Sequence, residues 1–147
     1  MKLSESPLSV LSGAPLRILV VDDYRDFAET TVLILSTAGH TVQSAQNGQA
    51  ALVIADQLQP HLVLLDLGMP GMTGYEVAKR LRQAPFGERL ILVAVTGYGQ
   101  LVDRVRTRAA GFSDHLLKPV KIEDLARVLA LVPSWTPGCE PAEATAR

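Results

Sequence analysis

The sequence predicts an α/β protein built around a five-stranded parallel sheet. Short β-rich runs alternate five times with segments of helical periodicity, and this alternation is typical of βαβ units. The chain has 147 residues, 48% of them hydrophobic, which suits one buried core. We therefore expect a single doubly wound domain at residues 17–132. Residues 1–16 are expected to form a flexible leader and residues 133–147 a flexible tail, because both are rich in Ser, Pro, Gly or small residues without periodicity.

The strands can be placed by their apolar runs and ordered by their composition. The first, third and fourth runs are continuously apolar, as expected of strands covered on both faces. The second run alternates with polar residues and the fifth is very short, so both belong at the sheet edges. With right-handed crossovers, this gives the strand order 2-1-3-4-5. The expected strands are Arg17–Asp22, Thr41–Ala45, Leu62–Leu67, Leu90–Thr96 and His115–Lys118.

Each strand is followed by apolar residues at helical spacing. Gly39, Pro60 and Pro85 mark where the first three helices stop. The fourth helix is expected at about Gln100–Ala110 and the fifth at about Ile122–Val132.

Composition excludes several classes of protein. A formal net charge of -1 argues against a nucleic-acid-binding arm and against a basic membrane-surface patch. The one cysteine, Cys139, cannot form an internal disulfide and fits a reducing compartment. The sequence shows no signal-peptide pattern and no apolar run of membrane-spanning length, so we expect a cytoplasmic protein that binds neither nucleic acid nor membrane.

Polar residues gather where the predicted strands end. Asp22 and Asp23 close the first strand, Asp66 the third, Thr96 the fourth and Lys118 the fifth. The carboxyl ends of parallel strands share one edge of the sheet, and open α/β sheets bind ligands there. Three carboxylates cannot share a small site without a cation, and one lysine does not balance them. A hard divalent ion that prefers oxygen ligands fits, and magnesium is the expected cofactor.

The same residue types suit phosphoryl transfer. An aspartate can act as a covalent nucleophile and form an acyl phosphate. Mg²⁺ and a lysine can neutralise and align the incoming phosphate, while a hydroxyl can donate a hydrogen bond to it. We therefore predict that Asp66, Thr96 and Lys118 carry the chemistry, with the metal beside them.

Four separated motifs resemble the receiver domains of two-component response regulators. They are Ile18–Asp23 (ILVVDD), Leu64–Tyr75 (LLDLGMPGMTGY), Val95–Thr96 and Leu117–Pro119 (LKP), and they agree with that family in order and spacing. The resemblance covers nearly all of the chain between the two terminal segments. Residues Leu67–Arg82 and the TGYG after the fourth strand are most similar to receivers attached to hybrid histidine kinases, which are bacterial signalling proteins.

This resemblance implies a flavodoxin-like fold and a set of roles. It makes Asp66 the phosphoacceptor and metal ligand, Asp23 a direct ligand, and Asp22 a ligand that often acts through water. The backbone carbonyl of Gly68 would complete the metal site. Thr96 would be the switch hydroxyl. The resemblance also implies that Lys118 pairs with the phosphate, and that its bond to Pro119 is cis. His115 departs from the pattern, because it stands where the family usually has an inward-turning Tyr or Phe.

The predicted function is a phosphorelay signalling module rather than an enzyme. Its partners would be a histidine kinase or histidine phosphotransfer protein and an unidentified downstream protein. A phosphate sink and a pseudo-receiver that is never phosphorylated are the alternatives. An aspartate-nucleophile phosphatase of the haloacid-dehalogenase type is disfavoured, because that family has a second Asp where this chain has Gly68.

Overall fold

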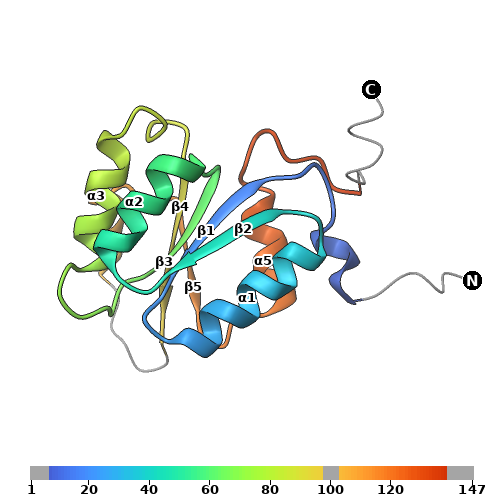
Figure 1. The fold of residues 1–147 in the computed structure, drawn as a ribbon, viewed down its shortest axis with the longest axis horizontal. Coiled ribbons are helices and arrows are strands. Elements are labelled where there is room, and N and C mark those ends of the chain that lie inside the picture. The colour runs from blue at the N-terminus through green and yellow to red at the C-terminus, as the bar shows by residue number, and fades with distance from the viewer. Residues whose placement is uncertain (1–6, 98–102, 139–147) are drawn as a thin grey trace, which may run out of the picture.

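The computed structural model describes residues 7–97 and 103–138 of the chain (Figure 1). Helices and strands alternate through the domain, as the sequence indicates. In chain order the elements are the 3₁₀ helix η1 (Pro7–Leu11), β1 (Arg17–Val21), α1 (Arg25–Thr37), β2 (Thr41–Ala45), α2 (Gly48–Leu58), β3 (Leu62–Asp66), α3 (Gly74–Gln83), β4 (Ile91–Thr96), α4 (Arg104–Ala109), β5 (Asp114–Leu117) and α5 (Ile122–Leu129).

The five strands form one parallel sheet in the order β2-β1-β3-β4-β5, which confirms the prediction. β3 is buried along its whole length, whereas the edge strand β2 has exposed and partly buried positions along most of its length. The composition of each run thus indicated its place in the sheet, because only a strand covered on both faces can be apolar throughout. Four of the strands end or begin one residue away from the predicted position. As a result, Asp22 and Lys118 lie just beyond their strands.

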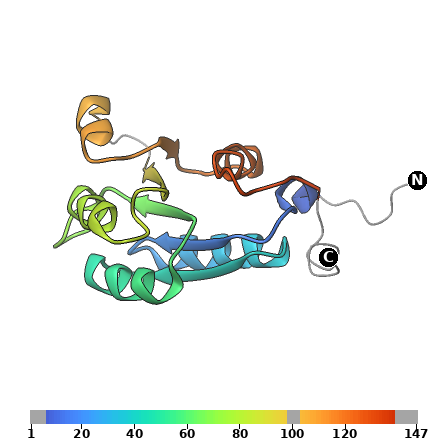
Figure 2. The same cartoon turned by 90° about the horizontal axis from the view of Figure 1, so that it is seen from above.

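Each central strand contributes side chains to two cores. Ile18 and Val20 point to the face covered by α1 and α5, while Leu19 and Val21 point to the face covered by α2 and α3. Figures 1 and 2 show these helix pairs on opposite sides of the sheet. The alternation follows from the two-residue repeat of a β-strand. Burial on both faces holds the strand ends, and therefore the polar residues attached to them, in fixed positions.

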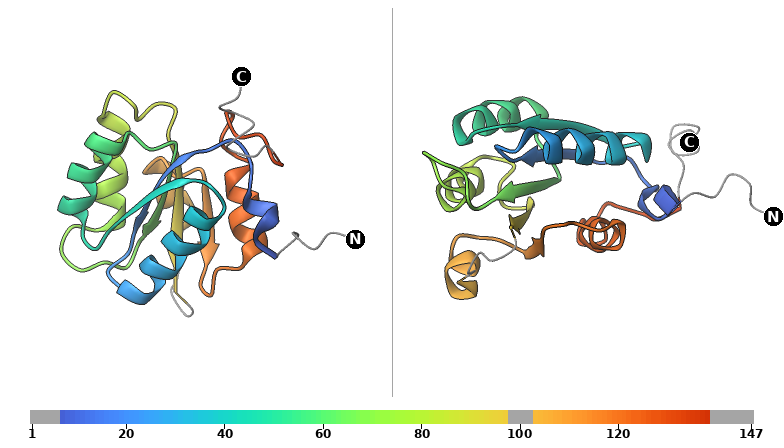
Figure 3. Two further views of the ribbon diagram at one scale, coloured as in Figure 1. Left: turned by 45° about the vertical axis from the view of Figure 1, so that its right-hand side comes forward. Right: turned by 90° about the horizontal axis from the view of Figure 1, so that it is seen from below.

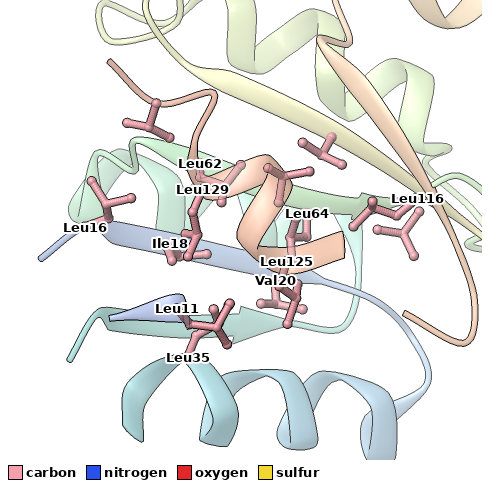
Figure 4. Close-up of a cluster of buried hydrophobic side chains, with 14 of the residues drawn as sticks. Leu11, Leu16, Ile18, Val20, Leu35, Leu62, Leu64, Leu116, Leu125 and Leu129 are labelled. Carbon is pink, nitrogen blue, oxygen red and sulfur yellow. The ribbon is translucent and has the colours of Figure 1, made fainter. Parts of the chain in front are cut away.

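Residues 7–16 pack against the domain, which corrects the expectation that they belong to a flexible leader. Leu11 and Leu16 are fully buried in the core shared by α1 and α5 (Figure 4). The ring of the buried His40 holds this segment: its Nδ1 accepts a hydrogen bond from Leu16 N–H at 3.0 Å, and its Nε2 lies 2.8 Å from the Leu11 carbonyl. Because Nδ1 accepts, the proton of the neutral ring is on Nε2, which donates to Leu11.

Residues 133–138 also pack, although they were expected to belong to a flexible tail. Trp135 contacts the same core, and Gly13 forms an antiparallel bridge with Pro137. Ala14 N–H donates to the Thr136 carbonyl at 2.9 Å. We call residues 7–16 together with 133–138 the terminal clasp; Figure 3 shows η1 beside α5 at the end of the sheet where β1 begins. The remaining residues of the two predicted flexible segments, 1–6 and 139–147, lie outside the described part of the chain.

Two helical expectations and one expectation about membranes can be compared with the structure. α4 lies within the range predicted for the fourth helix. Residues 100–102 of that range are outside the described part of the chain, and so are the last two residues of the TGYG motif. α5 ends at Leu129, three residues before the predicted end. No helix among residues 7–97 and 103–138 is both long and apolar enough to cross a membrane.

Candidate functional site

The loop from β1 to α1 places two aspartates at the carboxyl edge of the sheet. Asp22 is fully buried, and its Oδ1 accepts a hydrogen bond from Tyr24 N–H at 2.8 Å. Tyr24 is the residue that precedes α1, so this bond satisfies a backbone donor at the start of the helix. Asp23 is exposed. One carboxylate is therefore fixed by the backbone, and the other faces solvent.

Asp66 is the last residue of β3 and only 6% exposed. Its Oδ1 accepts a hydrogen bond from Gly68 N–H at 2.9 Å, which orients the carboxylate against the turn after the strand. Asp22, Asp23 and Asp66 each offer a carboxylate oxygen, and these oxygens all lie within 4.8 Å of one another. The structure thus brings together the three acidic residues that the sequence placed at strand ends. Gly68 lies in the exposed turn next to them.

Thr96 and Lys118 reach the same edge from β4 and β5. Lys118 N–H donates to the Thr96 carbonyl at 2.8 Å, so the two strand ends are joined. The Thr96 hydroxyl is buried and has no hydrogen-bond partner among the described residues. A buried hydroxyl without a partner is costly, which suits a group that binds an incoming oxygen. The Lys118–Pro119 bond is cis, as the resemblance implied.

The ammonium of Lys118 pairs with Asp22 rather than with Asp66 in the part of the chain that the structure describes. Lys118 Nζ lies 2.7 Å from Asp22 Oδ2 and 4.6 Å from the centre of the Phe27 ring. Phe27 is not among the site residues that were predicted from the sequence. Its position in the first turn after the acidic pair was the available signal, but helical periodicity cannot reveal a contact with a distant strand.

The electrostatics of the site favour a bound cation. The pKa of Asp66 is raised to about 6, mainly by burial and also by the charge of Asp22 and a hydrogen bond with Asp23, against the lowering effects of Gly68 N–H and Lys118. Asp22 Oδ2 accepts no aligned hydrogen bond from the described residues, despite its ion pair, and so retains coordinating capacity. Three carboxylates and one ammonium leave an excess of negative charge. This all-oxygen donor set fits a hard divalent ion such as Mg²⁺.

α4 is attached to α3 by an aromatic contact near the site. The Arg106 guanidinium lies 3.9 Å from the centre of the Tyr75 ring, and Tyr75 packs edge-on against Phe112 at 6.3 Å between ring centres. Tyr75 is the second residue of α3, which begins shortly after Asp66. On the outer side of α4, Val105 is 80% exposed. His115 lies in β5 and is partly buried.

Comparisons with known proteins agree with this geometry. The family model "Response regulator receiver domain" matches residues 18–130. The response regulator MprA of Mycolicibacterium vanbaalenii is 40% identical over 124 residues, which are 84% of this chain and 53% of that protein. The DNA-binding dual master transcriptional regulator RpaA of Synechocystis sp. is 37% identical over 79% of this chain and 48% of its own length. This chain thus spans about half the length of these two curated relatives.

A sensor protein and a solved structure are also similar to this chain. The virulence sensor protein BvgS of Bordetella bronchiseptica is 37% identical over 78% of this chain, which corresponds to 10% of that protein. The chemotaxis protein CheY4 of Vibrio cholerae superimposes with a TM-score of 0.74 and 27% identity, covering 81% of this chain and 99% of CheY4. Its fold agrees with the sequence-based resemblance. The chain belongs to the response regulator receiver domain family.

Proposed function

We propose that this receiver domain is phosphorylated on Asp66 in a Mg²⁺-dependent reaction and that phosphorylation changes how it binds a partner protein. The observation that carries the proposal is the convergence of four strand ends. Three carboxylate oxygens within 4.8 Å of one another lie at the edge that also carries Lys118 and the Thr96 hydroxyl, which has no hydrogen-bond partner in the described part of the chain. A carboxylate nucleophile, a metal site and two phosphate-binding groups are the parts that acyl phosphate formation requires.

In the proposed reaction an Asp66 oxygen attacks the phosphorus of a phosphohistidine. The new P–O bond forms as the P–N bond breaks, and the leaving imidazole keeps that electron pair and takes up a proton. A pKa of about 6 leaves most of Asp66 ionised at neutral pH, as a nucleophile must be. Asp22, Asp23, Asp66 and the Gly68 carbonyl would hold the Mg²⁺, which offsets the negative charge of phosphate and carboxylate. Lys118 and Thr96 bind the phosphoryl oxygens and fix their orientation.

The donor would be a histidine kinase or a histidine phosphotransfer protein, because either carries phosphohistidine. The signal would leave through the surface formed by α4, β5 and α5. Thr96 is the last residue of β4 and Lys118 follows β5, and α4 lies between these two strands in the chain. Movement of Thr96 and Lys118 toward a phosphoryl group would therefore shift α4. Val105 on α4 and Leu117 on β5 are exposed apolar side chains that a partner could cover.

Intact-mass spectrometry after incubation with acetyl phosphate and Mg²⁺ tests the chemical part. The protein should gain one phosphoryl group that is stable in acid and labile in base. Asp66→Asn should abolish the gain, because an amide is not a competent nucleophile here. Asp56→Asn, on the exposed side of α2, is the matched control and should label normally. Equal labelling of the Asp66→Asn variant would place the phosphorylation site elsewhere.

NMR shift mapping with beryllofluoride, a phosphoryl mimic, tests the signalling part. We expect perturbations at Asp66 and also along α4 and at His115. Shifts confined to the acidic edge would instead indicate a domain that stores phosphate without passing a signal, which is the behaviour of a phosphate sink.

A further inference from the structure

The segment from Asp22 through the first turn of α1 holds the Lys118 ammonium from two sides. Asp22 Oδ2 lies 2.7 Å from Lys118 Nζ, and the Phe27 ring centre lies 4.6 Å from the same atom. The other oxygen of Asp22 accepts from Tyr24 N–H, which immediately precedes α1, and Phe27 is in the first turn of that helix. One short connection therefore supplies both the anion and the aromatic face.

Burial makes both contacts effective. The Asp22 side chain is 1% exposed and the Lys118 side chain 23%. An aromatic ring attracts a cation through the negative potential of its face, and the attraction grows as water is removed. Phe27 also packs against the core under α1 and α5, so its ring cannot move freely. A leucine at this position could fill similar space, but it would offer no attractive face to the ammonium.

We propose that Phe27 is a positioning residue that holds Lys118 against Asp22 and thereby weakens Mg²⁺ binding at the acidic site. This inference rests on the proposed function. The ammonium and a divalent cation are both attracted to the Asp22 carboxylate, so each opposes the binding of the other. Any interaction that favours Lys118 at Asp22 must be overcome before the metal binds, and by linkage the effect is reciprocal. Phe27 does not touch the metal or the phosphate itself.

Phe27→Leu should strengthen Mg²⁺ binding by about two- to thirty-fold, which corresponds to the usual strength of a partly buried cation–π contact. Phe27→Tyr keeps the ring and should bind Mg²⁺ nearly as wild type does. Phe86→Leu, which removes a partly buried ring from the other core, controls for a general loss of packing. Affinities would be measured on the full chain by NMR titration with MgCl₂, and urea unfolding would confirm that each variant is folded.

A double-mutant cycle separates positioning from structural damage. In a Lys118→Gln background the ammonium is absent, so Phe27→Leu should leave the Mg²⁺ affinity unchanged. A structural defect at α1 would instead change the affinity equally in both backgrounds. In the metal-free wild type, nuclear Overhauser effects between the Phe27 ring and the Lys118 Hε protons should be present and should weaken as Mg²⁺ is added.

The outcomes distinguish this inference from the function on which it rests. Stronger binding by Phe27→Leu that disappears in the Lys118→Gln background supports the inference. Unchanged Mg²⁺ affinity in Phe27→Leu, or an equal change in both backgrounds, overturns the inference about Phe27. If the wild type still binds Mg²⁺ in that case, the proposed metal site is unaffected. A wild-type protein that does not bind Mg²⁺ would overturn both.

Discussion

Neutralising Asp66 should stabilise the folded protein, although the residue is central to the proposed function. The carboxylate is buried beside two other aspartates, and its pKa is raised from 3.8 to about 6. A group with a raised acid pKa stabilises the folded state when it is protonated, and this contribution is lost as pH rises from 3.8 through about 6. Asp66→Asn keeps the shape and can still accept a hydrogen bond from Gly68 N–H, but it never ionises.

The expected magnitude follows from the shift of about two pKa units. Each unit corresponds to about 1.4 kcal/mol, so Asp66→Asn should be more stable than wild type by about 3 kcal/mol at pH 8. At pH 5 Asp66 is almost fully ionised in the unfolded chain, whereas in the folded protein it is mostly protonated. The gain should then be about half as large.

Urea unfolding of both proteins at pH 5 and pH 8, with a chelator present, measures this difference. Other titrating groups cancel, because each pH compares two proteins that differ at one residue. Saturating Mg²⁺ should reduce the gap at pH 8, since the metal stabilises the wild type preferentially. A variant that is no more stable than wild type at pH 8, or a gain that is the same at both pH values, would refute the reasoning.

Three further substitutions test other contacts. His40→Ala should cost at least about 2 kcal/mol in urea unfolding at pH 7.5, because two buried backbone groups lose their partner. Burial lowers the pKa of His40, so wild-type stability should fall as pH drops below about 6.5, and the cost of the substitution should be smaller at pH 5.5. Arg82→Lys should cost about 2 kcal/mol and reduce hydrogen-exchange protection in the loops before β4 and β5, because a lysine cannot replace the guanidinium's bonds to three backbone carbonyls. Gly74→Ala should cost about 1–3 kcal/mol in the same assay and slow phosphorylation by acetyl phosphate, because the added Cβ would lie 2.6 Å from the Asp66 carbonyl oxygen.

Most of the domain fold could be predicted because its signals are local. Continuous apolar runs identified the central strands, and the alternating and short runs identified the edges. The terminal clasp could not be predicted in this way. Leu11, Leu16 and Trp135 carry no periodic pattern, and their burial depends on partners from the opposite end of the chain. The same holds for Arg82 of α3, whose hydrogen bonds to the Gly111 carbonyl depend on a loop that is distant in sequence.

The sequence predicts which residues come together at the site, but it does not predict which of them form pairs. Strand order and parallel direction place Asp22, Asp66 and Lys118 at one edge, since these follow from topology alone. The choice of Asp22 over Asp66 as the partner of Lys118 depends on side-chain geometry. The contact with Phe27 depends on the angle at which α1 leaves its strand. Neither quantity has a signature in residue spacing.

The terminal clasp has a consequence for the order in which the chain acquires its structure during synthesis. A ribosome releases residue 13 long before residue 137, yet Gly13 pairs with Pro137, and Leu11 is buried against a core that α5 helps to form. The first half of the terminal clasp therefore waits for the second half before its apolar side chains are covered. Contacts of such long sequence separation form late and slowly. While translation continues, the leucines of residues 7–16, which are buried in the folded domain, stay accessible to chaperones and to neighbouring chains. The clasp can form only after residues 133–138 have been synthesised.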